Sequence, residues 1–213
     1  MAEATDINGF FASTPQTVDA LVLTANYGMN KSISENFSLT RPVVLIGMMG
    51  AGKTSVGRAL AELFAVPFFD SDAEIEAAAR CSVAQIFADY GEPEFRRMER
   101  LVIARLLTGG ACVLSLGGGA FMDDQTRERI KKEAFSIWIK VDWNILLERV
   151  LRRDTRPMLR GGDPQEKLAK ILSEREPVYA EADIIVTCDD RPVAYNARQI
   201  RDAIHEALKK SCV

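Results

Sequence analysis

The sequence predicts an α/β domain with a five-stranded parallel sheet and helices on both faces. From residue 41 onward, short apolar runs of strand length alternate with stretches of helix length. A glycine-rich loop also stands between the first apolar run and the first helical stretch. Because parallel strands are joined by crossover helices, the alternation indicates a parallel sheet covered on both sides. Ligands of such sheets bind beyond the carboxyl ends of the strands.

The expected strands are short apolar runs, and the first is Val43-Val44-Leu45-Ile46. We expect them at residues 43–46, 67–69, 112–116, 135–141 and 183–187. The helices between them are expected at residues 55–64, 73–79, 83–90, 94–107, 124–133, 144–152, 164–181 and 192–210. In the helix at 94–107, apolar side chains from Phe95 to Leu106 gather on one side.

Residues 1–40 differ in composition from the rest of the chain. They contain no arginine and many serine, threonine and asparagine residues. Thr14-Pro15 is suited to start a short helix with apolar residues between Val18 and Leu23 on one side. We expect residues 1–40 to be an extension outside a domain at 41–213, and a tolerated tail rather than a partner-binding arm.

Composition narrows the class of protein. A chain of 213 residues with 47% hydrophobic residues suits one domain with a substantial core. The net charge of −3 gives no reason to expect nucleic acid as a partner. No apolar run approaches the ~18 residues of a membrane span, and no signal peptide is recognisable. We therefore expect a cytoplasmic monomer without membrane contact.

Cysteine and histidine are sparse. Cys81, Cys112, Cys188 and Cys212 are scattered without metal-ligand spacing, so reduced thiols are expected. The single histidine, His205, is expected to be a solvated helix residue. Acid–base chemistry by histidine is therefore not expected.

Residues 47–54 match the phosphate-binding pattern G-x-x-x-x-G-K-[ST]. The preceding strand and following helix provide the context in which backbone N–H groups surround phosphate oxygens at a helix N-terminus. Lys53 is expected to reach the β- and γ-phosphates, and the Thr54 hydroxyl to bind Mg²⁺. The residues expected around the phosphates of a nucleotide are Gly50, Ala51, Gly52, Lys53, Thr54 and Ser55. A glycine-rich turn before a helix is the less favoured interpretation.

Asp70 and Asp72 follow the second strand and are separated by one residue. One carboxylate can hold a water on Mg²⁺, while the other orients an acceptor hydroxyl and takes its proton. Aspartate is also favoured as a helix N-cap, so capping is the alternative. Next to a phosphate-binding loop, we favour the functional interpretation.

The start of the long helix carries several arginines. Arg96 and Glu99 are three residues apart, so they share a helix face and can pair. An arginine held in this way can bind a substrate carboxylate with its planar fork. Arg97 and Arg100 are expected to be solvated surface residues.

Gly117-Gly118-Gly119 follows the third strand. Three consecutive glycines suggest that the backbone closely approaches a ligand, and a flexible turn is the alternative. Arginines also cluster around residues 154–163, where a loop can close over phosphates and offset developing charge. Of these, Arg149 and Arg160 are expected to be solvated.

Together these motifs resemble shikimate kinases, small members of the nucleoside-monophosphate-kinase-like P-loop fold with a short lid. The resemblance spans residues 42–210. It rests on G-M-M-G-A-G-K-T, F-D-S-D, G-E-P-E-F-R-R-M-E, S-L-G-G-G-A, T-R-P-M-L and R-E-P-V-Y. It implies transfer of the γ-phosphate of ATP to the 3-hydroxyl of shikimate, with Mg²⁺, in chorismate and aromatic amino-acid biosynthesis.

The resemblance also implies roles for individual residues. Asp72 would bind the substrate hydroxyls and act as the base, together with Lys53 and Arg156 as catalytic residues. Asp70 would support the water shell of Mg²⁺. Arg96 and Arg175 would bind the carboxylate beside Gly118 and Gly119. The adenine would lie near Arg152 or Arg153 and near Arg191-Pro192.

Two departures and two alternatives stay open. The segment between Arg153 and Arg156 is shorter than in many relatives, which leaves the adenine-contacting arginine unassigned. Residues 1–40 have no counterpart in the minimal domain. A gluconate-type kinase is the second enzyme hypothesis, and a non-catalytic nucleotide-binding module is the third.

Overall fold

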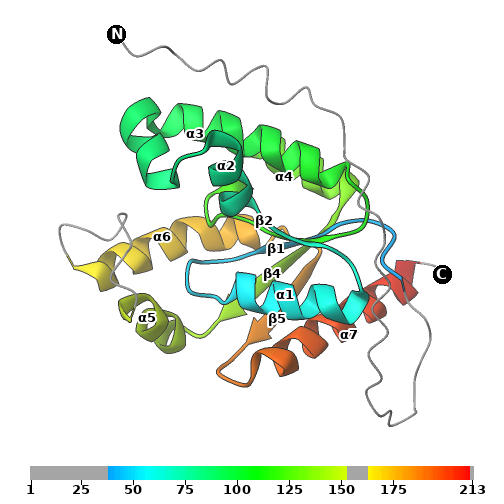
Figure 1. The fold of residues 1–213 in the computed structure, drawn as a ribbon. Coiled ribbons are helices and arrows are strands. Elements are labelled where there is room, and N and C mark those ends of the chain that lie inside the picture. The colour runs from blue at the N-terminus through cyan, green and yellow to red at the C-terminus, as the bar shows by residue number, and fades with distance from the viewer. Residues whose placement is uncertain (1–37, 153–162, 212–213) are drawn as a thin grey trace. The chain divides into compact units, whose positions relative to one another are not determined.

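A computed structural model of the chain describes residues 38–152 and 163–211. In this part of the chain, one parallel sheet has the strand order β2-β3-β1-β4-β5 (Figure 1). The strands are β1 Val43–Ile46, β2 Phe68–Asp70, β3 Val113–Ser115, β4 Phe135–Val141 and β5 Ile184–Cys188. The expected fold class and the five-stranded parallel sheet are therefore confirmed.

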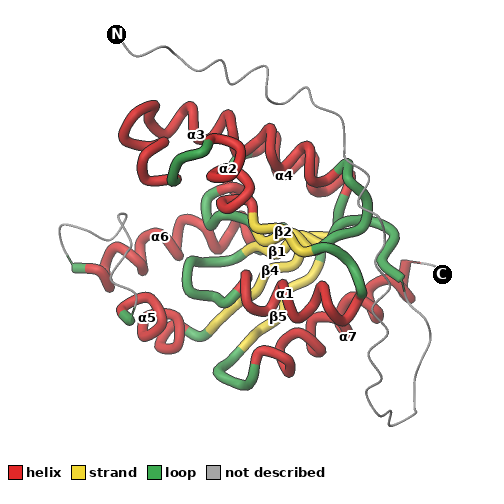
Figure 2. The backbone as a smooth tube through the Cα atoms, in the orientation of Figure 1, coloured by secondary structure: helices red, strands yellow, loops and turns green. Residues whose placement is uncertain are grey.

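Helices cover both faces of the sheet. They are α1 Lys53–Phe64, α2 Ser71–Ala79, α3 Val83–Leu107, α4 Asp124–Glu133, α5 Trp143–Leu151, α6 Pro164–Tyr179 and α7 Val193–Ser211, with a short 3-10 helix at Ala120–Met122. Helices α1 and α7 pack together on one face, and α3 and α4 lie on the other (Figure 1). The backbone tube shows the alternation of strand and helix that the sequence predicts (Figure 2).

Strand β1 forms the centre of the core. All four of its side chains are buried, since the strand has neighbours on both edges and helices on both faces. Helix α1 packs its own buried residues, among them Val56 and Leu60, against this layer. The spacing of four between these two residues places them on one helix face.

The sheet brings the ends of three strands to one edge. Strand β1 lies between β3 and β4. The chain therefore places β2 and β3 on one side of β1, and β4 and β5 on the other. In the register of the sheet, Ser115 is the partner of both Leu45 and Asp70. The loops after β1, β2 and β3 therefore begin side by side, where parallel sheets bind their ligands.

The two helices expected at 83–90 and 94–107 are joined in α3. The helix is kinked at Gly91, whose φ of 78° and ψ of 174° are not helical. Pro93 follows in the first turn beyond the kink, where a missing N–H is tolerated. The kink lies where the sequence predicts a break between two helices. No loop separates the two helical parts of α3, because only Gly91 departs from helical φ and ψ.

Some expectations about single residues need correction or stay open. His205 is half-buried rather than solvated, because α7 packs on α1 and brings its ring centroid 6.1 Å from that of Phe64. Cys81, Cys112 and Cys188 are free thiols as expected, and Cys212 lies outside the described residues. Within the described ranges, no helix has the length and apolar character to span a membrane.

The predicted boundary at residue 40 is not settled by the fold. Residues 1–37, including the expected short helix after Thr14-Pro15, lie outside the described residues. Leu39 belongs to the predicted extension, yet its side chain is buried against the domain. The division into an extension and a domain at 41–213 stays a prediction.

Candidate active site

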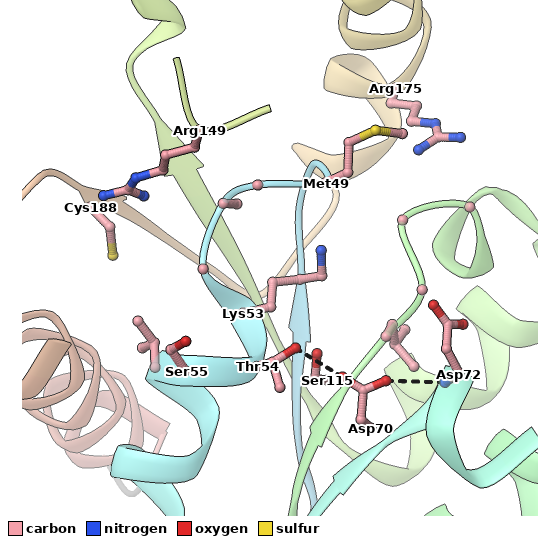
Figure 3. Close-up of a pocket in the computed structure, with 18 of the residues that line it drawn as sticks. Met49, Lys53, Thr54, Ser55, Asp70, Asp72, Ser115, Arg149, Arg175 and Cys188 are labelled. Atoms are coloured by element: carbon pink, nitrogen blue, oxygen red, sulfur yellow. Dashed lines mark hydrogen bonds between the residues drawn. The ribbon is translucent and has the colours of Figure 1, made fainter. Parts of the chain in front are cut away.

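A pocket of about 830 Å³ opens where the loops after β1, β2 and β3 begin (Figure 3). Most of the residues that the sequence marked line this pocket. They are Gly50, Ala51, Gly52, Lys53, Thr54, Ser55, Asp70, Asp72, Arg96, Gly118, Gly119, Arg175 and Arg191. Arg153, Arg156 and Arg160, with the segment expected to form the lid, lie outside the described residues.

The loop between β1 and α1 supplies the floor of the pocket. Nζ of Lys53 donates hydrogen bonds to the carbonyl oxygens of Gly47, at 2.9 Å, and Met48, at 3.1 Å. Figure 3 shows Lys53 between Arg149 on one side and Asp72 on the other. Helix α1 begins at Lys53, and its N-cap residue, Gly52, has no side chain to cap the backbone N–H groups of the first turn. Its N–H groups are therefore available to an anion.

Asp70 has two contacts, one for each carboxylate oxygen (Figure 3). Oδ1 accepts a hydrogen bond from the backbone N–H of Asp72 at 3.2 Å, which caps α2. Oδ2 accepts a hydrogen bond from Oγ1 of Thr54 at 2.9 Å. Both interpretations of Asp70 are thus compatible with the structure. The adjoining hydroxyl and carboxylate oxygens are donors of the kind that Mg²⁺ prefers.

Asp72 lies in the first turn of α2 and faces the pocket (Figure 3). Burial raises the pKa of its carboxyl group, and the negative charge of Asp70 raises it further. The positive charges of Lys53 and Arg96 oppose this rise. A carboxylate with increased proton affinity beside a phosphate-binding loop is suited to accept a proton from a hydroxyl.

Arg96 and Glu99 form the ion pair that their spacing predicts. Nη1 of Arg96 donates to Oε2 of Glu99 at 2.6 Å, and Glu92 provides a second partner for the guanidinium group at 3.2 Å. The other oxygen of Glu99, Oε1, is buried without a hydrogen-bond partner among the described residues. Burial raises the pKa of Glu99 to about 7, although Arg96 acts against the rise. Arg96 is thus held on one side and exposed to the pocket on the other.

The neighbouring arginines only partly follow expectation. Arg97 pairs with Glu94 on the helix surface at 2.7 Å. Arg100 is not simply solvated, since its Nη1 donates to Oδ2 of Asp123 at 3.0 Å. Asp123 caps α4, and the pair joins α3 to α4 at the point where they pack.

The three glycines give the other side chains room. A methyl group added at Gly119 would lie 2.6 Å from Nη2 of Arg96, and one at Gly118 would lie 3.0 Å from Nη1 of Arg175. At Gly117, a methyl group would lie 2.6 Å from Oδ1 of Asp72. Two guanidinium groups and a carboxylate therefore contact a backbone free of side chains. This close approach favours the ligand-facing interpretation over a flexible turn.

Arg175 and Tyr179 reach the glycines at 117–119 from α6. Arg175 is 9% exposed and Tyr179 is 1% exposed, one helical turn later. The Tyr179 hydroxyl donates a hydrogen bond to the carbonyl oxygen of Gly118. Tyr179 was not singled out as a site residue from the sequence, although its spacing of four from Arg175 in R-E-P-V-Y places both on one face of the helix.

Two further groups of residues were missed. Phe87 and Phe95 line the pocket, and their ring centroids are 4.6 Å apart. Arg149 was expected to be solvated, but it lines the pocket on the side of Lys53 away from Asp72 (Figure 3). Its Nη2 donates to Oδ1 of Asp190 at 2.7 Å and to the carbonyl oxygen of Asp189 at 3.3 Å. These two acceptors hold the guanidinium group beside the phosphate-binding loop.

The sequence matches known proteins over most of its length. A family model described as shikimate kinase matches residues 49–208. A shikimate kinase from Rhodopseudomonas palustris is 48% identical over 168 residues, which cover 79% of this chain and 83% of the relative.

Solved structures give a similar result. A shikimate kinase from Acinetobacter baumannii in complex with shikimate superposes with a TM-score of 0.77 at 35% identity. The match covers 82% of this chain and 98% of that one. A gluconokinase from Sinorhizobium meliloti has a TM-score of 0.51 at 19% identity over 81% of this chain and 99% of that one, which shows a shared fold alone.

Proposed function

The chain belongs to the shikimate kinase family, and we propose that it transfers the γ-phosphate of ATP to the 3-hydroxyl of shikimate. The products would be shikimate 3-phosphate and ADP. The observation that carries the proposal is the approach of Arg96 and Arg175 to adjacent glycines, in a pocket that Asp72 and Lys53 also line. This arrangement suits an acid that also carries a hydroxyl to be phosphorylated.

The donor phosphates would lie over the loop between β1 and α1. The N–H groups at the start of α1 and the ammonium group of Lys53 would surround them. Nζ of Lys53 donates to the neutral carbonyl oxygens of Gly47 and Met48, and a charged phosphate group can replace these acceptors. Charge that develops on the transferred group would be stabilised there without rearrangement of the loop.

The acceptor would occupy the side of the pocket toward Asp72. Its carboxylate would bind between Arg96 and Arg175, which supports recognition by planar guanidinium groups. Asp72 would orient the reacting hydroxyl and accept its proton as phosphate transfer proceeds. The rings of Phe87 and Phe95 would cover the apolar part of the carbon ring.

Mg²⁺ fits the oxygens of Thr54 and Asp70, with Asp70 acting through a water as the sequence predicts. When bound, the ion would neutralise phosphate charge. Thr54 and Asp70 already contact each other at 2.9 Å, so their positions require little change to serve the same ligand.

The nucleoside would extend toward Arg149 and the loop at Asp189–Arg191. Arg149 adds a candidate adenine contact to Arg152, Arg153 and Arg191. Of the predicted residues, Arg153 and the catalytic Arg156 lie outside the described residues, and their roles stay proposals. The proposed enzyme works as a cytoplasmic monomer.

A coupled assay of ADP release tests the function directly. Wild-type protein is supplied with ATP, Mg²⁺ and shikimate, gluconate or a nucleoside monophosphate. ADP release that depends on shikimate alone supports the proposal. Release with gluconate would favour the gluconate-type alternative, and nucleotide binding without release would favour the non-catalytic module. Arg96→Lys should raise KM for shikimate much more than KM for ATP, because lysine lacks the planar fork.

A further inference from the structure

A buried amide lines the pocket next to Arg191. Asn196 stands in the first turn of α7 and is 4% exposed. Its Nδ2 donates two hydrogen bonds, to the carbonyl oxygens of Asp189 and Arg191, both at 3.2 Å. One side chain thus holds both ends of the turn Asp189–Arg191, which lies in the four-residue connection between β5 and α7.

The turn held by Asn196 also carries groups that face the pocket. Arg191 lines the pocket, and its guanidinium carbon lies 3.8 Å from the ring centroid of Tyr195. The carboxylate of Asp189 accepts a hydrogen bond from Nε of Arg191 at 2.7 Å. The orientation of Arg191 is therefore set by the turn and by the first turn of α7.

The same turn fixes Arg149 from the other side. The carbonyl oxygen of Asp189 accepts from both Nδ2 of Asn196 and Nη2 of Arg149. Asp190 adds the carboxylate that pairs with Arg149 at 2.7 Å. Asn196 is thereby connected through one carbonyl group to an arginine beside the phosphate-binding loop.

The burial of Asn196 has a cost that its packing does not explain. Its Oδ1 is buried without a hydrogen-bond partner among the described residues. Such a group destabilises a fold relative to an apolar side chain of the same shape. An amide at this position is consistent with a need for the two donors of Nδ2.

We propose that Asn196 is a positioning residue that holds the turn at Asp189–Arg191, so that Arg149 and Arg191 are presented to the nucleoside end of ATP. The inference rests on the proposed function only for the identity of the nucleotide. It assigns to Asn196 no contact with phosphate or with the acceptor. Its loss should therefore weaken nucleoside recognition and leave the phosphate and acceptor sites intact.

The test compares Asn196→Leu, which keeps the branched shape but loses both donors, with wild-type protein. ADP binding is measured by calorimetry, and inorganic tripolyphosphate is used as a competitor that has phosphates but no nucleoside. We expect the ADP dissociation constant to rise about tenfold, since two hydrogen bonds are lost. The inhibition constant of tripolyphosphate and KM for shikimate should stay unchanged. Asn196→Asp should be worse than Asn196→Leu, because a carboxylate would face two carbonyl oxygens.

Gln199→Leu is the matched control. Gln199 lies on the same helix, its Oε1 is also buried without a partner among the described residues, and it does not line the pocket. This variant should bind ADP as the wild type does. If Asn196→Leu unfolds, Asn196→Ser provides the same comparison with a smaller polar side chain.

Two results would overturn the inference. The first is unchanged ADP affinity in a folded Asn196→Leu variant. The second is an equal loss of affinity for ADP and tripolyphosphate, which would indicate a general distortion of the pocket. If instead the wild type releases no ADP with shikimate, the proposed function fails, while the ADP titrations still decide the role of Asn196.

Discussion

Glu99 accepts a hydrogen bond from Arg96 at 2.6 Å, and the acid is the more deeply buried member of the pair. The side chain of Glu99 is 2% exposed, against 25% for Arg96. Burial therefore dominates the titration of Glu99 and raises its pKa to about 7, despite the adjacent positive charge. The charge of Glu99, which holds the proposed substrate-binding residue Arg96, is thus sensitive to pH near neutrality.

The free energy of unfolding should carry the signature of Glu99. Between its ordinary pKa of 4.5 and its folded pKa of about 7, the native state keeps a proton that the unfolded chain has lost. The contribution of this group to stability is therefore present at low pH and is lost as the pH rises through that window. Glu99→Gln should gain stability relative to wild type between about pH 5 and about pH 8, by at most about 3 kcal/mol.

Urea unfolding of both proteins at the two pH values measures this difference. Glu94→Gln is the control, because the hydrogen bond from Arg97 lowers the pKa of Glu94 and removes its titration from the window. A stability difference between Glu99→Gln and wild type that does not change with pH would contradict the prediction.

Gly119→Ala should impair use of the acceptor. The added methyl group would lie 2.6 Å from Nη2 and 2.9 Å from Nη1 of Arg96, so the guanidinium group must move. Because the arginine would leave its position near the proposed carboxylate site, KM for shikimate should rise about tenfold or more with little change in KM for ATP. Steady-state kinetics with each substrate varied in turn measure both constants.

Gly109→Ala is the matched control for this substitution. A methyl group at Gly109 meets its nearest neighbour, the carbonyl oxygen of Leu106, at an ordinary distance of 3.5 Å. Normal kinetics for Gly119→Ala would show that Arg96 adjusts without loss and that its position at the glycine is not needed.

The sequence predicted the parts of the fold whose pattern is local. Val43–Ile46 reads as a buried strand because every residue in it is apolar, and the structure buries all four. The strand order was not predictable, because it depends on which side of β1 each crossover helix packs. The position of His205 was missed for a similar reason, since burial of its ring depends on the contact between α7 and α1.

The candidate site shows the same limit. Lys53 and Thr54 follow from one motif, and Arg96 and Glu99 follow from helical spacing. Arg149 could not be placed from its neighbours, because its partners Asp189 and Asp190 lie 40 and 41 residues away in the sequence. Asn196 was missed for the related reason that its two acceptors are backbone carbonyl groups, which leave no trace in the side-chain pattern.

Removal of residues 1–37 should leave kcat and both KM values unchanged. Every described residue that lines the pocket lies at Met49 or beyond, and the shortened chain keeps the buried side chain of Leu39. The segment carries apolar residues between Val18 and Leu23 that would matter if they packed on a partner surface. Kinetics, thermal unfolding and light scattering of the shortened protein test the boundary. A large fall in Tm, or aggregation, would show that the segment is structural.

Asp72→Asn should lower kcat strongly with a smaller effect on ATP binding. The amide keeps a hydrogen-bonding shape but cannot accept a proton, so a general-base contribution of about 10²- to 10⁴-fold would be lost. Because burial raises the pKa of Asp72, kcat of the wild type should fall as the pH drops through that pKa and the base becomes protonated. The residual rate of Asp72→Asn should lack this decrease.

Asp124→Asn is the control, since the carboxylate of Asp124 lies in the first turn of α4 and its side chain is 84% exposed. Loss of ATP affinity without loss of turnover at saturating ATP would instead make Asp72 part of the metal site.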